Sequence, residues 1–430
     1  MDASRQHRLG LYMSVPFCRS KCTYCNFASG VYPASQHKRY IDRLIADLEG
    51  SAEWAERMGL ILPRRVDTVY LGGGTPSLLA PELLKQLFAT VRSDFDLDPD
   101  AEITVECAPG QIAEETLEAF QAVGVNRVSL GVQSFNDREA HGTGRLHSRA
   151  IVEADLRRLR GAGIDNLNVD LIAGLPGQTF ASWGESLSAL VDSGVPHASV
   201  YMLEVDEDSR LGREMLAGGA RYHAGLVPSD DAMAQMYTWA IERLAQAGLG
   251  QYEISNFCRP GFASRHNLRY WQRRPYLGLG LDASSALYAA APELPDRGHA
   301  IPSDVSRSTT ASELTDYLAG PQPLETTLLS PARQHEEAWF LGLRLNCGVD
   351  LAAIEREFGS KAVTRARSVV DGLVQAGLLD LTGDTVRLTP RGQLLANNVF
   401  QEFLDQEFLD LGDDESEPQL PPLVETGMSR

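Results

Sequence analysis

Three of the six cysteines in this chain stand within eight residues of one another. Cys18, Cys22 and Cys25 have the spacing Cys-x3-Cys-x2-Cys and follow the first strand-like run of the sequence. Three thiolates can hold three irons of a four-iron cubane and leave the fourth iron with an open position. A structural zinc site is the alternative, but it needs four ligands, and no fourth cysteine or suitably spaced histidine lies nearby. The spacing therefore predicts a [4Fe–4S] cluster on these cysteines.

The remaining composition is typical of a cytoplasmic protein. Cys107, Cys258 and Cys347 stand alone, and six cysteines in 430 residues are too few for a disulfide scaffold. No segment approaches the roughly 20 apolar residues that span a bilayer, and the N-terminal residues lack the apolar core of a signal peptide. We therefore expect a cytoplasmic location.

The charge of the chain disfavours nucleic acid as a partner. Lys and Arg number 39 and Asp and Glu 58, which gives a net charge of −19. A protein this acidic is repelled by nucleic acid and by anionic lipid unless it concentrates a basic patch, and the sequence contains only short groups of arginines. A nucleic-acid partner is not expected.

Six strand-like runs alternate with amphipathic stretches in the N-terminal half. The strand-like runs are residues 9–15, 66–71, 102–106, 127–133, 167–173 and 198–203. The amphipathic stretches are residues 36–48, 81–91, 114–123, 150–162 and 181–193. Such alternation predicts a parallel α/β sheet with helices packed outside it. Six units are too few for a complete eight-stranded barrel, so we expect an open, partial (β/α)6 barrel that places its ligands at the C-terminal strand ends.

Polar residues occur at these strand ends. The turn Gly72–Pro76 follows the second strand, Glu106 ends the third, Gln133 ends the fourth, and Asp170 lies in the fifth. Polar side chains in otherwise apolar strands are costly to bury without partners. Each could serve a structural hydrogen bond, but together at one mouth they predict a site for a polar ligand.

The C-terminal region has a mostly helical pattern. We expect helices at residues 334–345, 351–358 and 362–377, a hairpin over 378–388 and a last helix over 390–409, an order that is winged-helix-like. Such folds often bind DNA, which the acidic background disfavours. The expected domains are residues 1–290 (barrel with an αβ extension), 291–325 (surface connection), 326–410 (winged-helix-like domain) and 411–430 (disordered acidic tail).

The cysteine motif after the first strand of a partial barrel resembles the signature of the radical S-adenosylmethionine (SAM) superfamily. In that family the open iron binds the amino and carboxylate groups of SAM, and one electron from the reduced cluster releases a 5′-deoxyadenosyl radical. Further motifs at residues 11–18, 131–136, 170–179 and 388–392 resemble the anaerobic coproporphyrinogen III oxidase-like group. The resemblance implies that the SAM site is formed by Tyr12, Tyr24, Gly73, Gly74, Thr75, Glu106, Gln133, Arg145 and Asp170.

The sequence departs from those oxidases at two points, and in both, as in one further motif, it resembles the HemW-type haem chaperones. Phe27 stands where the oxidases have a further cysteine, and only residues 1–8 precede the first strand. The run His266–Trp271 resembles the HNxxYW element of the chaperone group. The resemblance implies haem as a ligand, and imidazole commonly ligates haem iron, which makes His266 a candidate axial ligand. The alternative is that His266 ties down a loop while Tyr270 and Trp271 belong to the core.

The leading functional hypothesis is therefore a haem chaperone that carries a SAM-ligated [4Fe–4S] cluster and passes haem to acceptor apoproteins, respiratory and membrane-associated ones among them. A homodimer is left open. The first rival is an oxygen-independent coproporphyrinogen III oxidase, which Phe27 and the HNxxYW element argue against, so that no such activity is expected. The second rival is a radical enzyme that modifies nucleic acid, which the charge disfavours.

Overall fold

Six parallel strands form the centre of the fold in the computed structural model, which describes residues 8–289, 305–320 and 325–404. They lie in the order β1-β3-β4-β5-β6-β7, and each adjacent pair is parallel. Their bounds are β1 Leu9–Val15, β3 Arg65–Gly73, β4 Asp96–Cys107, β5 Arg127–Gln133, β6 Asn166–Ala173 and β7 His197–Met202. The expected open α/β barrel of six strand–helix units is confirmed.

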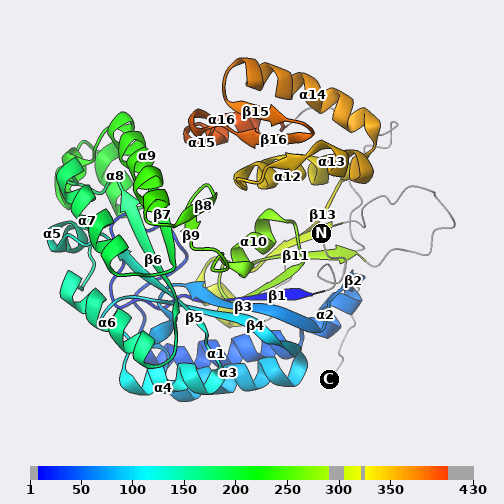
Figure 1. The fold of residues 1–430 in the computed structure, drawn as a ribbon. Coiled ribbons are helices and arrows are strands. Elements are labelled where there is room, and N and C mark those ends of the chain that lie inside the picture. The colour runs from blue at the N-terminus through cyan, green and yellow to red at the C-terminus, as the bar shows by residue number, and fades with distance from the viewer. Residues whose placement is uncertain (1–7, 290–304, 321–324, 405–430) are drawn as a thin grey trace.

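Helices cover one face of this sheet, which we call its outer face (Figure 1). They are α1 Ala34–Glu49, α2 Ser51–Arg57, α3 Pro81–Asp94, α4 Glu114–Val123, α5 Asp137–Gly142, α6 Arg149–Gly161, α7 Phe180–Asp192 and α9 Asp230–Gln246. In α1 the buried residues Tyr40, Ile41, Leu44 and Leu48 recur every three or four positions, so that one stripe of the helix packs on the sheet.

The opposite, inner face of the sheet is polar. Successive side chains of a strand point to opposite faces. In β5 and β6 the apolar Leu130 and Val169 belong to the core beneath the helices, whereas Ser129, Asn168 and Asp170 bond to one another on the inner face. The helix α10 (Arg265–Trp271) lies over this inner face (Figure 1).

Further strands extend both edges of the sheet. On one edge β10 (Tyr276–Leu279) pairs in parallel with β1, followed by antiparallel β11 (Ser284–Ala289), β12 (Val305–Thr309) and β13 (Glu325–Leu329), and β2 (Leu60–Ile61) pairs with β11. On the other edge β7 is followed by antiparallel β9 (Asn256–Cys258) and β8 (Gly250–Glu253). Short connecting helices are η2 (Pro76–Leu78), α8 (Arg210–Leu216) and η3 (Arg221–Leu226).

Residues 291–325 were expected to form a surface connection, but their described part contains a strand and a helix. Residues 305–309 form β12 within the sheet, and α11 (Leu314–Ala319) packs beside α1, where Tyr317 bonds to Asp47. The buried positions of β12 are Ser306 and Ser308, whose small polar side chains give no apolar alternation to recognise. The expected domain boundaries themselves remain predictions.

The C-terminal region consists of helices packed on a small three-stranded sheet. The helices are α12 (Pro331–Arg344), α13 (Leu351–Phe358) and α14 (Ser360–Gln375), and the strands β14 (Val349–Asp350), β15 (Leu379–Thr382) and β16 (Thr385–Leu388) lie in the order β14-β16-β15. The stacked rings of Trp339 and Phe403, 4.5 Å apart, mark its separate core.

The prediction of a single last helix over residues 390–409 is wrong. Two short helices, α15 (Pro390–Leu394) and α16 (Ala396–Gln401), take its place, and residues 405–409 lie outside the described part together with the expected acidic tail. Leu395 leaves the helical conformation (φ −114°, ψ 28°) between them. Gly392 meanwhile packs so closely on the backbone of Leu378 that α15 is held against the hairpin.

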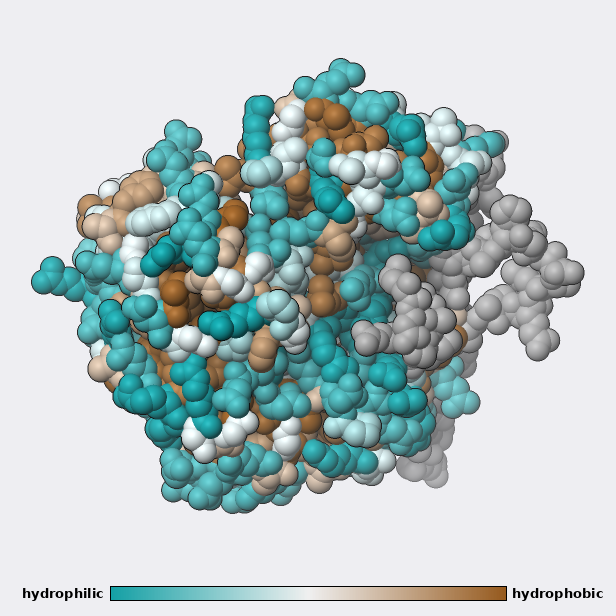
Figure 2. All heavy atoms as spheres, viewed as in Figure 1, coloured by the Kyte–Doolittle hydropathy of each residue, from teal (hydrophilic) through white to brown (hydrophobic). Residues whose placement is uncertain are grey.

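Hydrophilic residues dominate the face seen in Figure 2, and the apolar ones are scattered in small patches. Within the described ranges, none of the helices combines the length and the apolar character that crossing a membrane requires.

Candidate functional site

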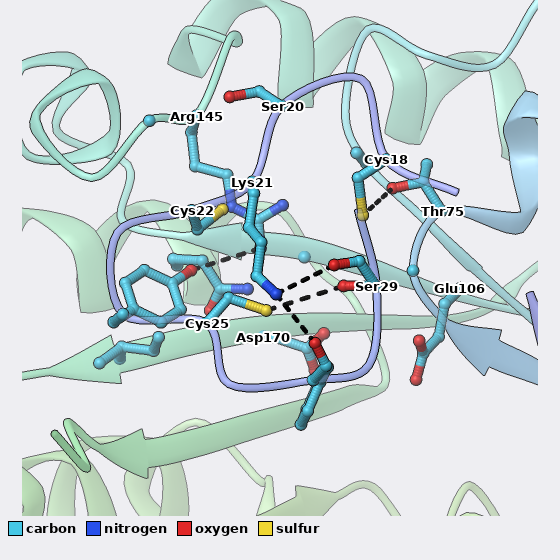
Figure 3. Close-up of a pocket in the computed structure, with 18 of the residues that line it drawn as sticks. Cys18, Ser20, Lys21, Cys22, Cys25, Ser29, Thr75, Glu106, Arg145 and Asp170 are labelled. Carbon is cyan, nitrogen blue, oxygen red and sulfur yellow. Dashed lines mark hydrogen bonds between the residues drawn. The ribbon is translucent and has the colours of Figure 1, made fainter. Parts of the chain in front are cut away.

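A cavity of about 360 Å³ opens at the C-terminal ends of the parallel strands, where a barrel of this kind binds its ligands. Three cysteines and polar side chains from several strands line it together (Figure 3). Of the residues predicted from the sequence, the cavity wall contains Cys18, Cys22, Cys25, Tyr24, Gly73, Gly74, Thr75, Glu106, Gln133, Arg145 and Asp170. Tyr12 and His266 are not part of the wall.

The cysteines lie on a loop that hydrogen bonds hold at both ends. The Cys18 N–H donates to the carbonyl of Gly30 (2.8 Å), and the Gly30 N–H donates to that of Pro16 (2.9 Å). Within the loop, the Lys21 ammonium donates to the carbonyls of Phe27 (3.1 Å) and Ser29 (3.0 Å). The side chain of Lys21 thus closes the loop around Cys22 and Cys25.

The glycine-rich turn after β3 supports the same loop. A Cβ on Gly74 would lie 2.7 Å from the carbonyl oxygen of Val15 and 2.8 Å from that of Phe17, so only glycine lets the two backbones approach. Gly73 has a φ of 96°, which also favours glycine, and its N–H donates to Glu106 Oε2 (3.1 Å). The glycines therefore position the cysteine loop as well as leave room for a ligand.

The three thiols make only weak contacts with the protein. Cys18 Sγ lies 3.9 Å from Thr75 Oγ1, Cys25 Sγ lies 3.9 Å from Ser29 Oγ, and all three cysteines are free of disulfides. Burial raises the pKa of the Cys18 thiol above its ordinary value, which disfavours a bare thiolate there. No group of three or more His, Cys, Asp or Glu side chains placed to hold a metal ion is found among the described residues.

This donor set fits an iron–sulfur cluster better than a single metal ion. Thiolates are the ligands that such clusters take, and a cubane holds each thiolate at a different corner, farther apart than ligands around one ion. Three soft sulfur donors around a cavity provide for three irons and leave room beside the fourth.

Two carboxyl groups face the cavity from β4 and β6, the strands on either side of β5. Glu106 accepts hydrogen bonds from the Tyr70 hydroxyl (2.8 Å) and the Gly73 N–H, and burial raises its pKa to about 7. Asp170 accepts from Asn168 Nδ2 (2.6 Å) and Ser129 Oγ (3.2 Å), and burial likewise raises its pKa above the usual range. A ligand that brings a cationic amine or hydroxyl groups would stabilise both groups in their ionised form.

Arg145 and Gln133 complete the polar wall. The guanidinium of Arg145 lies 3.5 Å from the Tyr24 hydroxyl. Burial opposes its charge, but Tyr24, Cys22 and Asp170 together raise its pKa. Gln133 has a φ of 70° at the bulged end of β5, and a non-glycine residue held there stores strain, as residues at binding sites often do.

Tyr12 and His266 lie deeper, on the inner face of the sheet. The Tyr12 ring stands 6.1 Å from that of Tyr70 and 6.4 Å from the imidazole of His266. His266 is fully buried, with Nδ1 bonded to Thr68 Oγ1 (2.9 Å) and Nε2 to the Tyr270 hydroxyl (2.8 Å). Burial lowers its pKa to about 3, so the imidazole is neutral. In this arrangement neither ring nitrogen of His266 is available to a haem iron.

A buried set of polar residues at and behind the cavity wall was not predicted from the sequence. Ser129 and Asn168 lie two positions before Gly131 and Asp170, and Ser199 and His197 follow on the next strand. The signal was the two-residue alternation of polar side chains along β5, β6 and β7, which indicates a polar inner face.

Comparison with known proteins places the chain in a family. Residues 12–190 match the radical SAM superfamily, and residues 329–395 match the HemN C-terminal domain. A curated haem chaperone HemW of Mycobacterium tuberculosis is 36% identical over 399 residues, which cover 92% of this chain and 94% of that protein. A haem chaperone HemW of Lactococcus lactis is 32% identical over 396 residues, which cover 91% of this chain and 96% of that protein.

The architecture has a solved counterpart in the Escherichia coli coproporphyrinogen III oxidase HemN, described as a radical SAM enzyme. The two folds agree with a TM-score of 0.76 over 93% of this chain and 91% of that one, at 23% sequence identity, so the likeness concerns the fold alone. Since the sequence is more than 30% identical to two HemW proteins over nine tenths of its length, the chain belongs to the HemW family of haem chaperones within the radical SAM superfamily.

Proposed function

We propose that this chain binds haem together with a [4Fe–4S] cluster that carries SAM, and that it transfers the haem to acceptor apoproteins. The observation that supports this best is the cavity itself, in which three cysteines and a ring of polar strand-end residues converge on a chain of the haem chaperone family. The acceptors are proposed to include respiratory and membrane-associated proteins. A homodimer is compatible with the proposal.

In this proposal Cys18, Cys22 and Cys25 hold three irons, and the SAM lies against the wall beside them. When bound, a reduced cluster of this kind supplies a single electron. Glu106 and Asp170 orient cationic and hydroxyl groups of the ligand, and Arg145 orients its carboxylate. Tyr24, Gly73, Gly74, Thr75 and Gln133 shape the remaining wall, and Tyr12 supports Tyr70 from behind.

Haem binding is proposed to involve the helix α10. His266, Tyr270 and Trp271 combine a potential iron ligand with aromatic rings that could contact a porphyrin. The bonds of His266 to Thr68 and Tyr270 must open before the imidazole can ligate iron. Haem ligation by His266 therefore requires a local rearrangement of α10, and a slow phase in haem binding is expected.

Anaerobic reconstitution with iron and sulfide, followed by haem titration watched by absorbance, tests the proposal. We expect saturable haem binding and subsequent transfer to an apo-haem protein such as apomyoglobin. The His266→Ala variant should shift the Soret band, and the exposed His141→Ala is the matched control. Normal haem spectra for His266→Ala would remove His266 as the ligand, and the absence of haem binding by the wild type would overturn the proposal.

The rival activity is tested on the same reconstituted protein. Incubation with coproporphyrinogen III, SAM and a low-potential reductant should yield no protoporphyrinogen. Phe27 lines the cavity with 63% of its surface exposed, and the resemblance to the oxidases implies a cysteine at this position in those enzymes. Robust turnover would contradict the chaperone function.

A further inference from the structure

An unbroken chain of hydrogen bonds links the cavity to the helix α10. It begins at Asp170 Oδ1, which accepts from Asn168 Nδ2 (2.6 Å). Asn168 Oδ1 lies 2.6 Å from His197 Nδ1, and His197 Nε2 lies 3.0 Å from the Tyr252 hydroxyl. The Tyr252 oxygen accepts from the backbone N–H of Ser264 (3.2 Å).

The chemistry of the members fixes the direction of every bond. The Asn168 amide points its NH2 toward Asp170 and its oxygen, which can only accept, toward His197. Burial lowers the pKa of His197 well below its usual range, so the neutral ring donates from Nδ1 and accepts at Nε2. Tyr252 must then donate to His197, and all the hydrogens point toward Asp170. Bonds aligned in this way polarise and strengthen one another.

The far end of this hydrogen-bond chain holds the N-cap residue of α10 in place. Ser264 is the N-cap of α10, is fully buried, and accepts a hydrogen bond from the Asn267 N–H at 3.3 Å. At the other end of the helix, the guanidinium of Arg344 from α12 lies 4.3 Å from the Trp271 ring centroid. Arg273, just after the helix, forms a bidentate pair with Glu357 of α13, both bonds 2.7 Å long. The helix therefore joins the cavity wall to the C-terminal domain.

We propose that His197 and Tyr252 are positioning residues that couple ligand binding at Asp170 to the placement of α10. A ligand whose hydroxyl or cationic groups contact Asp170 competes for the carboxylate that terminates the chain, and the change reaches the N-cap of α10 through Asn168, His197 and Tyr252. Two sites coupled in this way influence each other reciprocally. The inference rests on the proposed binding of SAM in the cavity, and it makes α10 the element through which SAM regulates haem binding.

Hydrogen–deuterium exchange on the reconstituted holoprotein tests the coupling without haem. Addition of S-adenosylmethionine should change the exchange of the α10 backbone amides by at least about fivefold, the lower end of typical coupling strengths. In Tyr252→Phe, which keeps the ring but removes the hydroxyl, SAM should still bind while this response disappears. The matched control is Tyr317→Phe. Tyr317 is a buried tyrosine whose hydroxyl donates to Asp47 on α1, and it is not part of the hydrogen-bond chain from Asp170 to Ser264.

A second variant keeps the test decisive if Tyr252→Phe does not fold. His197→Phe, outside the cavity wall, removes both bonds in the middle of the hydrogen-bond chain and should likewise lose the response of α10. Either variant that binds SAM and retains the full response overturns the coupling, as does a wild-type protein that binds SAM with no change in α10. Haem titration on the same samples separates the two proposals: haem binding without a response of α10 to SAM rejects only the coupling, and no SAM binding rejects both.

Discussion

The reactive side chains of the cavity and those of the helix α10 differ in how many partners they have within the protein. In the cavity, the nearest partners of the Cys18 and Cys25 sulfurs are hydroxyls 3.9 Å away, and burial raises the pKa of Glu106 to about 7. On α10, His266 has a partner on each ring nitrogen, and the guanidinium of Arg269 is fully buried among four acceptors. The cavity keeps its groups ready for a ligand, whereas α10 first uses its groups to hold the protein together.

The largest contrast concerns the cysteines. Replacement of Cys18, Cys22 or Cys25 by Ala should abolish the brown absorbance of the reconstituted cluster, because two thiolates cannot hold three irons. The protein itself should stay folded, because these thiols stabilise little, and circular dichroism checks this. Cys347→Ala, an exposed cysteine of the C-terminal domain, is the matched control and should keep the full absorbance and iron content. A single cavity variant with undiminished iron would contradict the cluster assignment.

The reverse outcome is expected on α10. Arg269→Met should lower the free energy of unfolding by about 3–5 kcal/mol, because it leaves the buried carboxylate of Asp67 with one arginine fewer and the carbonyls of Arg8 and Pro275 without their donor. Denaturant unfolding of the cluster-free protein measures the loss. Lys38→Met, which breaks an exposed ion pair with Asp42 on α1, should cost less than about 0.5 kcal/mol. If Arg269→Met and Lys38→Met lowered the unfolding free energy equally, the structural role of α10 would be contradicted.

This contrast explains how far the sequence predicts the molecule. The cysteines, Glu106, Gln133 and Asp170 lie at or near strand ends, and parallel strands bring their C-terminal ends to one edge, so a linear pattern is enough to place them together. The burial of His266 depends instead on how α10 packs against Thr68 of β3, some two hundred residues earlier. No local pattern contains that information.

Other differences have similar causes. Helix patterns predict where helices form but not where the backbone leaves the helical conformation, as it does at Leu395, next to α15, whose Gly392 packs on the backbone of Leu378. The strand β12 is buried through Ser306 and Ser308, residues whose local preference is for turns. In both places tertiary packing overrides the local signal.

The pH dependence of the unfolding free energy extends the comparison to α12, the helix of the C-terminal domain that contacts α10. His335 of α12 is fully buried, and burial together with the nearby charge of Arg273 lowers its pKa to about 4. A lowered pKa of a histidine means that the unfolded chain binds the proton first, so its contribution is complete above pH 6.5 and is lost as the pH falls toward 4. From neutral pH down to pH 5 the loss is about 2 kcal/mol.

Denaturant unfolding at a series of pH values, with His335→Gln for comparison, measures this term. The variant should have a lower stability at neutral pH and a flatter decline on acidification. A decline of the same slope in both proteins would assign the acid sensitivity to other groups, and an imidazole that titrates near pH 6.5 in the folded protein by NMR would contradict the lowered pKa.

The smallest expected effect compares two threonines by the same substitution. Thr68 bonds to His266 Nδ1 at 2.9 Å and to Arg269 Nε at 3.3 Å, whereas the side-chain contact of Thr75 is the Cys18 sulfur at 3.9 Å. Valine replaces either hydroxyl by a methyl group of similar size. Thr68→Val should therefore cost about 1 kcal/mol of unfolding free energy, since buried partners lose a hydrogen bond, and Thr75→Val should change it by less than about 0.5 kcal/mol. Thr75→Val should instead shift the reduction potential of the reconstituted cluster, because hydrogen bonds to the sulfurs tune that potential. If Thr75→Val destabilises the fold more than Thr68→Val does, the cavity side chains also stabilise the fold, and the contrast between the cavity and α10 is contradicted.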